Sequence, residues 1–130
     1  MTKLNLNLNL NLTDVRPFIG SQDFEVSKAF YEALGWTTEY LDDQLALMAN
    51  GDHRFYLQRY YQQDWLENTM LHLTVADAAA CHAQIAAVLA NGAYGDARVA
   101  PPKQEDYGAL VTYVWDPAGA LLHLAQWNDA

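Results

Sequence analysis

The sequence predicts an α+β domain in which a module of one strand, one helix and three further strands occurs twice, at a spacing of about 55 residues. Two stretches with helical periodicity each follow an Asp and end at a Gly, at residues 23–35 and 77–92. Short segments rich in Val, Tyr, Leu and Trp, separated by turn residues, lie around both. The 130 residues suffice for one domain, and the apolar fraction of 52% opposes disorder.

The expected organisation is an arm at residues 1–12 followed by a single domain at residues 13–127. Within the domain we expect a first module at about 13–60, a connector at 61–68 and a second module at 69–127. In the arm, Leu alternates with Asn from Leu4 to Leu12, which is the period of a strand. Because Asn is a poor strand former, the arm needs a partner edge, either in its own domain or in a second subunit.

The first module is predicted from caps and turns. Asp23 is placed as the N-cap of a helix, Glu25 favours the positive end of its dipole, and Gly35 ends it in a left-handed conformation. Asn50-Gly51-Asp52 predicts a hairpin. The strands expected in this module are 15–19, 36–41, 44–49 and 53–60.

The second module follows the same order. Asp77 caps an alanine-rich helix that runs to about Leu89, and Asn91-Gly92 closes it. Asp116-Pro117-Ala118-Gly119 predicts a tight turn in which the Asp116 side chain bonds the backbone two residues on. The strands expected in this module are 70–75, 93–100, 110–115 and 120–127, with a break at Pro101-Pro102.

Composition narrows the classes of partner. A net charge of −9 opposes nucleic-acid binding and favours the approach of a cationic ligand, although acidity can also serve solubility alone. No apolar run approaches the roughly 20 residues of a membrane helix, so no membrane partner is expected. The single Cys81 cannot form an internal disulfide, which predicts a reducing cytoplasmic location.

Two motifs carry a resemblance to a known family. Residues 21–36 resemble the first helix of the glyoxalase, bleomycin resistance and extradiol dioxygenase superfamily, also called vicinal oxygen chelate, and residues 116–119 resemble its last hairpin. The resemblance covers residues 13–127. It implies two βαβββ modules that form a curled mixed sheet cup, with helices on the outer face, usually in a homodimer.

Residues 67–71 and the hairpin that leads to His123 resemble the bleomycin resistance branch in particular. Members of that branch are also short and acidic. The resemblance implies that this chain, like them, sequesters a cationic ligand in clefts shared by two subunits, without catalysis.

The resemblance also implies where a metal would be held. In metal-dependent members the ligand positions correspond to Arg16, Tyr56, Met70 and His123. Arginine is cationic and methionine is a soft thioether, so this set does not suit a catalytic divalent metal, and no cofactor is expected. The alternative is a divalent metal held by His72 and His123, as part of a lyase or dioxygenase. Whether the protein is an enzyme stays open, with binding favoured.

Strand alternation assigns residues to two faces. One set is expected beneath the helices: Val15, Ile19, Phe55, Leu57, Leu71, Leu73, Val75, Leu122 and Leu124. The other set is expected to line the cup and bind the ligand: Arg16, Phe18, Arg54, Tyr56, Gln58, Tyr60, Met70, His72, Tyr113, Trp115 and His123.

The second set is aromatic with a few polar groups, which suits a planar organic ligand. Arg16 and Arg54 argue against a cationic ligand unless acidic residues pair with them, and they could equally hold a carboxylate. The alternative is that these aromatic side chains fill the cup or a dimer interface. The sequence therefore predicts a cytoplasmic, homodimeric, metal-independent protein that binds a small aromatic molecule.

Overall fold

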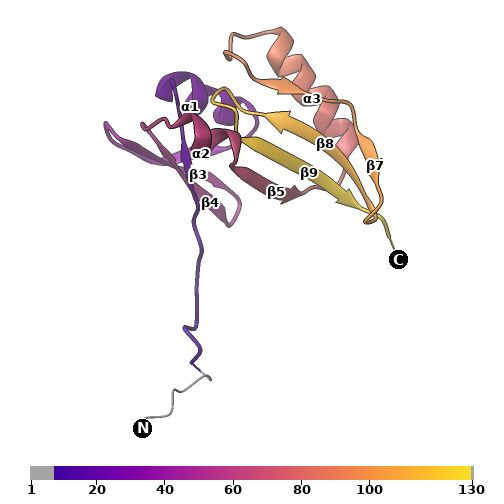
Figure 1. Ribbon diagram of the computed structural model, residues 1–130, viewed down its shortest axis with the longest axis horizontal. Coiled ribbons are helices and arrows are strands. Elements are labelled where there is room, and N and C mark those ends of the chain that lie inside the picture. Colours follow the sequence, from indigo (N-terminus) through magenta and orange to yellow (C-terminus); the bar gives the residue numbers. More distant parts are fainter. Residues whose placement is uncertain (1–7, 130) are drawn as a thin grey trace.

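The computed structural model describes residues 8–129, and its strands form two sheets (Figure 1). The elements of the first half are β1 (Phe18–Gly20), α1 (Phe24–Ala33), β2 (Thr37–Leu41), β3 (Leu45–Asn50) and β4 (His53–Gln58). After α2 (Gln63–Glu67), the second half contains β5 (Met70–Thr74), α3 (Ala78–Ala90), β6 (Arg98–Val99), β7 (Lys103–Glu105), β8 (Ala109–Trp115) and β9 (Leu121–Trp127).

The two sheets have related topologies. The first has the order β1-β4-β3-β2, and the second has the order β5-β9-β8-β6, with β7 also paired to β8. In each sheet the first strand of the half pairs in parallel with the last, β1 with β4 and β5 with β9, and the remaining pairs are antiparallel. The predicted α+β fold class is confirmed.

The helix boundaries follow the predicted caps. The Asp23 carboxylate accepts a hydrogen bond from the Val26 N–H at 3.2 Å, and the Asp77 carboxylate accepts one from the Ala80 N–H at 2.9 Å. Gly35 follows α1 with φ +100°, a conformation that glycine adopts without the steric cost of a Cβ atom. Local sequence therefore determines where both long helices begin and where the first one ends.

One apolar core joins the two halves. It contains Phe24, Phe30 and Tyr31 from α1, Ile85 from α3, and inward-facing residues of both sheets such as Leu122. The helices lie on one side of the sheets, and the opposite faces carry no helix among the described residues (Figure 1). Those uncovered faces are where a ligand can reach strand side chains.

A buried polar contact fixes the final turn against α1. Asp116 is fully buried, its Oδ1 atom accepts hydrogen bonds from the N–H groups of Ala118 (2.9 Å) and Ala120 (3.0 Å), and the Tyr31 hydroxyl donates to Oδ2 at 2.7 Å. The predicted bond to the backbone two residues on is confirmed. The contact to Tyr31 is one that the turn motif did not predict.

Three features differ from the sequence prediction. The first strand begins at Phe18 instead of residue 15, and Val15, expected beneath the helices, is 71% exposed. Pairing starts only where the Pro17 carbonyl accepts from the Tyr56 N–H, since proline itself has no N–H to donate. Strand β4 ends at Gln58 instead of Tyr60, and the strand expected at 93–100 is reduced to Arg98–Val99.

Two short elements were not predicted. Helix α2 spans five residues and Gln62 gives it no side-chain cap, so the sequence carries no start signal for it. Strand β7 follows the two prolines and has only three residues.

The arm forms no strand over residues 8–12, and the remainder of the predicted arm strand lies outside the described residues. No helix in residues 8–129 is long and apolar enough to cross a membrane.

Candidate ligand-binding faces

The structure divides the predicted ligand-binding residues between two faces, one on each sheet. Arg16, Phe18, Arg54, Tyr56 and Gln58 belong to β1, β4 or the segment before β1, whereas Met70, His72, Tyr113, Trp115 and His123 belong to β5, β8 and β9. Within residues 8–129, no aromatic contact or side-chain hydrogen bond joins the two groups. We call them the first face and the second face.

The first face is built around two stacked rings. Phe18 and Tyr56 are paired in register on the parallel strands β1 and β4, and their ring centroids are 4.9 Å apart at an interplanar angle of 22°. The Arg16 Nη1 atom donates to the Tyr56 hydroxyl at 2.9 Å. Phe18 remains 49% exposed, so this pair presents apolar surface to solvent.

Both arginines of the first face pair with carboxylates. Arg16 Nε donates to Asp14 at 2.6 Å, and Arg54 donates to both oxygens of Glu39, at 2.8 and 3.0 Å. These hydrogen bonds lower the pKa of Asp14 and of Glu39, so both carboxylates are ionised at neutral pH. The two arginines argued against a cationic ligand unless acidic residues paired with them, and Asp14 and Glu39 do so. The arginines therefore give the first face no net positive charge.

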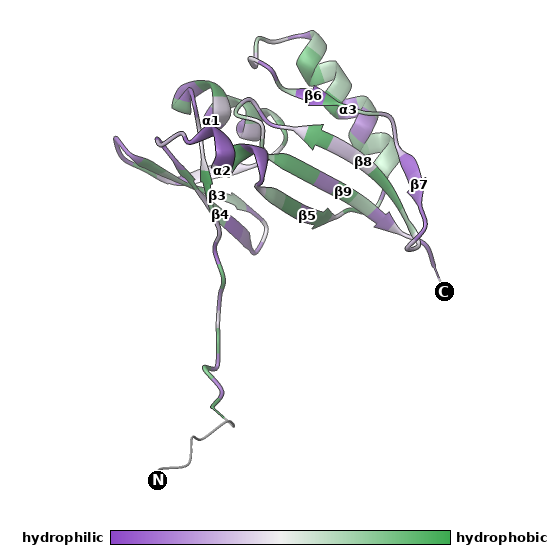
Figure 2. Ribbon diagram, viewed as in Figure 1, coloured by the Kyte–Doolittle hydropathy of each residue, from purple (hydrophilic) through white to green (hydrophobic). Residues whose placement is uncertain are grey.

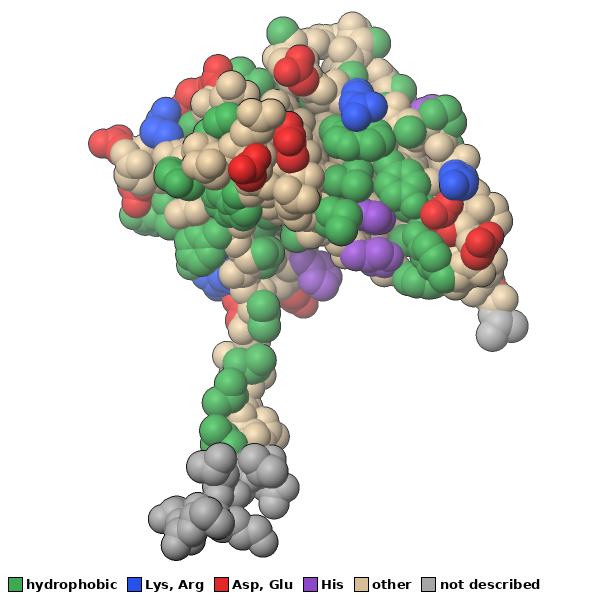
Figure 3. Space-filling view, viewed as in Figure 1, with side chains coloured by type: hydrophobic (Ala, Val, Ile, Leu, Met, Phe, Trp, Pro, Cys, Tyr) green, Lys and Arg blue, Asp and Glu red, His purple; other side chains and the backbone are tan. Residues whose placement is uncertain are grey.

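The second face carries a row of five rings in contact. Along β8, β9 and β5 the centroid distances are 5.0 Å for Tyr113–His123, 6.2 Å for His123–His72 and 5.5 Å for His72–Trp127. Tyr107 extends the row with its ring 5.8 Å from Trp127. Figure 3 shows histidine side chains between hydrophobic ones on the side of this sheet away from α3. Exposed apolar and aromatic surface is typical of interaction sites, so the second face is a candidate ligand-binding surface.

Polar contacts hold two of these rings. His123 Nε2 lies 3.3 Å from the Met70 sulfur, and the Tyr113 hydroxyl donates to Glu105 at 2.9 Å. Burial lowers the pKa of His123, the neighbouring His72 lowers it further, and Glu105 partly opposes both. His123 is therefore a neutral imidazole at neutral pH. Burial and the bond to Glu105 raise the pKa of Tyr113, which stays protonated.

Two of the predicted ligand-binding residues, Tyr60 and Trp115, lie outside the rows of contacting rings on the two faces. Tyr60 packs on Trp65 with ring centroids 6.0 Å apart, away from the rings of both faces. The guanidinium of Arg98 lies 3.8 Å from the centroid of the Trp115 ring and covers one side of that indole. One face of the Trp115 ring, a predicted ligand contact, is therefore covered by the Arg98 side chain of the same sheet.

Several residues of the faces were missed in the sequence. Trp127 alternates with His123 along β9, so the period of two was a sufficient signal for it. No such signal exists for Tyr107 and Asp14, because loop geometry brings them to the faces. The same is true of Glu39, whose position depends on the pairing of β2 with β3.

The residues do not fit the divalent metal that the fold family implies. Arg16 is hydrogen-bonded to Asp14 and Tyr56 and belongs to a different face from Met70 and His123. In the described part of the chain, no group of three His, Cys, Asp or Glu side chains converges. His72 and His123 lie side by side, but two imidazoles and a thioether lack the oxygen donors that such a metal prefers.

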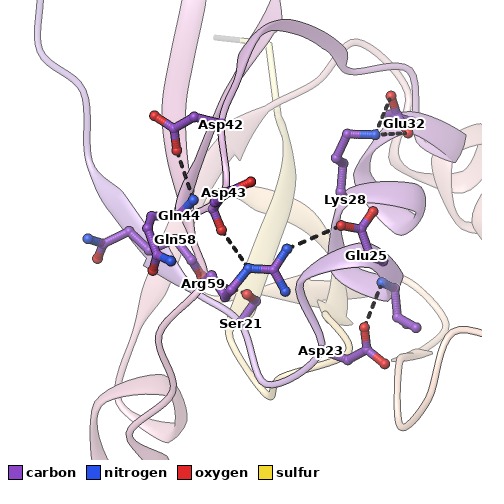
Figure 4. Close-up of polar contacts among 11 residues, drawn as sticks. Ser21, Asp23, Glu25, Lys28, Glu32, Asp42, Asp43, Gln44, Gln58 and Arg59 are labelled. Carbon is purple, nitrogen blue, oxygen red and sulfur yellow. Dashed lines mark hydrogen bonds and ion pairs between the residues drawn. The ribbon is translucent and has the colours of Figure 1, made fainter.

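Surface charge is strongly negative in the described structure. Arg59 joins α1 to the turn between β2 and β3, donating to Glu25 at 3.3 Å and to the Asp43 carbonyl at 2.6 Å (Figure 4). Among residues 8–129, every Lys and Arg except Arg98 has a carboxylate partner. Most carboxylates have no cationic partner within the described residues, so the field outside the faces favours positively charged ligands.

Comparison with known proteins connects this architecture to solved structures. A bleomycin-binding protein complexed with bleomycin is 25% identical, with a TM-score of 0.73 over 88% of this chain and 98% of that one. A bleomycin resistance determinant encoded on the transposon Tn5 is 24% identical, with a TM-score of 0.74 over 92% and 100%. A lactoylglutathione lyase from Agrobacterium tumefaciens is 14% identical, with a TM-score of 0.64 over 88% and 94%. No family model and no curated protein matches the sequence.

Proposed function

We propose that this chain, which has the fold of the vicinal oxygen chelate superfamily and matches structures of its bleomycin resistance branch, binds a small aromatic cation without metal chemistry. The observation that carries the proposal is the row of rings on the second face, from Tyr113 through His123 and His72 to Trp127. Planar ligands stack on such rings, and a cation gains a further 0.5 to about 2 kcal/mol over an aromatic face.

Charge supports a cation over an anion. Asp14 and Glu39 neutralise the two arginines of the first face, and the described surface carries an excess of unpaired carboxylates. A carboxylate ligand would have to displace one of these ion pairs, whereas a cationic ligand would not.

A homodimer is the second part of the proposal. The two faces belong to different sheets, and no described aromatic contact or side-chain hydrogen bond joins them. A cup lined by both sets therefore needs the first face of one copy opposite the second face of another. Such a site would hold the ligand between two subunits, as the resemblance implied. Cytoplasmic location, predicted from the single cysteine, is kept as part of the proposal.

The test is a tryptophan-fluorescence titration with three probes: bleomycin, a planar aromatic cation and a planar aromatic carboxylate. We expect the two cationic probes to bind more tightly than the carboxylate, with the same affinity in EDTA and in added zinc. Preferential binding of the carboxylate, or affinity that depends on zinc, would contradict the proposal.

Two variants locate the site. Trp127→Ala removes a ring that is 46% exposed on the second face, and Tyr40→Ala is the control, because Tyr40 is 51% exposed on β2, away from both ring clusters. Loss of one stacked ring costs about 0.5–1.5 kcal/mol beyond burial, which corresponds to roughly two- to tenfold in affinity. Only the Trp127 variant should show this loss. Equal effects of the two variants would place the ligand elsewhere.

A further inference from the structure

Three side chains on the second face bring metal-binding donor atoms together. Met70 and His72 lie on the same side of β5 because they are two residues apart, and His72 is paired in register with His123 on β9. Figure 2 shows the two strands side by side. The His123 Nε2 atom lies 3.3 Å from the Met70 sulfur, and the ring centroids of His72 and His123 are 6.2 Å apart. A thioether and two imidazoles therefore meet on one sheet.

The distance between the His123 nitrogen and the Met70 sulfur is that of two ligands on one metal ion. Bonds of about 2.0–2.1 Å to imidazole nitrogen and about 2.3 Å to sulfur place neighbouring ligand atoms about 3–4 Å apart. The observed 3.3 Å lies in this range. His72 is exposed, so rotation of its side chain can bring a third donor to the same ion.

Packing does not occupy these three side chains. None of them belongs to the apolar core of the described residues. Met70 is 62% exposed, and its unbranched side chain adapts readily to a partner. In residues 8–129, no ion pair joins either histidine to a carboxylate. The donor atoms are therefore available to a ligand.

The chemistry of the donors selects the kind of ion. Magnesium, calcium and manganese prefer oxygen ligands, whereas a thioether is soft and selects Cu(I), an ion that imidazole also suits. Imidazole binds metals in its neutral form, so all three donors are uncharged. A divalent ion would keep two uncompensated charges in this site, and a monovalent ion keeps one. The set therefore favours a soft monovalent ion.

The neighbouring rings support a cation at this place. The Trp127 ring lies 5.5 Å from His72, and the Tyr113 ring lies 5.0 Å from His123. Aromatic faces attract a nearby cation through their quadrupole. The rings thus flank the three donors on both sides along the row.

We propose that Met70, His72 and His123 form a binding site for Cu(I). The divalent site that the resemblance implies would also need Arg16 and Tyr56, which are hydrogen-bonded to each other on the first face. The Cu(I) site instead takes all its donors from two adjacent strands of one sheet. It goes beyond the proposed function and does not depend on an organic ligand, but the two ligands would compete for the same rings.

Silver(I) is the first probe, because it shares the charge and softness of Cu(I) and keeps its oxidation state in air. Cys81 is the only cysteine in the chain, and a free thiol also binds soft metals. The full-length protein is therefore used with Cys81→Ala, in chloride-free buffer, in a calorimetric titration. Met70→Leu removes the sulfur at nearly constant volume from an exposed position. His82→Gln on α3 is the control for a histidine outside the second face.

We expect one silver ion per chain, at least tenfold weaker binding in Met70→Leu, and unchanged binding in His82→Gln. Zinc should bind far more weakly than silver. Equal effects of the two substitutions would overturn the proposal, and so would zinc binding as tight as that of silver. Circular dichroism of Met70→Leu should match that of the parent protein, so that a loss of binding reports the donor and not the fold.

Nuclear magnetic resonance of ¹³C-methyl methionine locates the ion directly. Silver should shift the Met70 methyl signal, identified by its loss in Met70→Leu, while the signal of Met48, which is 0% exposed, stays in place. An unshifted Met70 signal would contradict the site.

Cu(I) itself is then offered under anaerobic conditions against a colorimetric Cu(I) chelator. The Cys81→Ala protein should withdraw Cu(I) from the chelator, and the protein that also carries Met70→Leu should not. Silver binding without Cu(I) binding would overturn the assignment of the ion. The titration with bleomycin and the planar probes tests the proposed function separately, since the three donors are present whether or not an organic ligand binds.

Discussion

Removal of the Tyr31 hydroxyl should destabilise the fold far more than removal of an exposed hydroxyl in the same kind of contact. Tyr31 is 1% exposed and Asp116 is 0% exposed, and the hydroxyl donates to Oδ2 at 2.7 Å. In Tyr31→Phe no cavity forms, but that oxygen loses its donor without access to water. A buried acceptor left without a partner costs about 1–3 kcal/mol, and a charged one lies at the upper end of that range.

Urea unfolding at neutral pH measures this cost, and the chain offers a matched control. Tyr40 donates to Asp42 at 2.6 Å, but Tyr40 is 51% exposed, so water replaces the lost bond in Tyr40→Phe. We expect about 2–3 kcal/mol for Tyr31→Phe and less than about 0.5 kcal/mol for Tyr40→Phe. Similar losses for the two variants would refute the reasoning.

The deficit of Tyr31→Phe should depend on pH. Burial raises the pKa of Asp116, and its hydrogen bonds, including the one from Tyr31, oppose that rise. The folded state therefore binds the Asp116 proton more tightly than the unfolded state, and this contribution to stability is present at low pH and lost as pH rises through the folded pKa. Without the hydroxyl the pKa rises further. The deficit should thus shrink as pH falls from 8 toward 5, and a deficit that grows on acidification would contradict this assignment.

Three further outcomes are expected. Gly20→Ala should destabilise the protein by about 2 kcal/mol or more in urea unfolding, because a Cβ there would lie 2.5 Å from the Tyr60 carbonyl oxygen; a loss below 0.5 kcal/mol would contradict it. Glu39→Gln should weaken binding of a cationic probe several-fold by leaving Arg54 without its carboxylate, with little loss of stability, since exposed ion pairs contribute about 0–1 kcal/mol. Because the pKa of His123 is lowered, the affinity for a cation should stay constant through neutral pH and fall only at acid pH, where the ring is protonated. A loss of affinity already above pH 7 would contradict this expectation.

Much of the fold could be predicted because its signals are local. The caps at Asp23 and Asp77 and the turn at Asp116 each act through atoms within four residues, so the sequence contains the whole interaction. The start of β1 could not be found in this way. Valine favours strands, but Val15 stays outside the sheet because Pro17 and the pairing of Arg16 with Asp14 interrupt the strand before it.

The candidate site was predicted less completely, because alternation along a strand determines which side chains share a face but not what stands opposite them. It placed His72 beside His123, and the register of β5 with β9 gives the same pair. It did not show that the residues of the first and second faces lie on separate sheets. That depends on how two modules pack around a common core, which no single strand encodes.

The charge of the first face is the clearest case of a property that depends on strand pairing. The two arginines of this face, considered without their partners, would predict a site for an anion. Arg54 is on β4 and Glu39 is on β2, and they meet across β3, which separates the two strands in the sheet. Asp14 reaches Arg16 from the segment before β1. The proposed preference for a cation therefore depends on the sheet order, because these carboxylates neutralise the two arginines and leave the surrounding acidic surface as the main charge near the face.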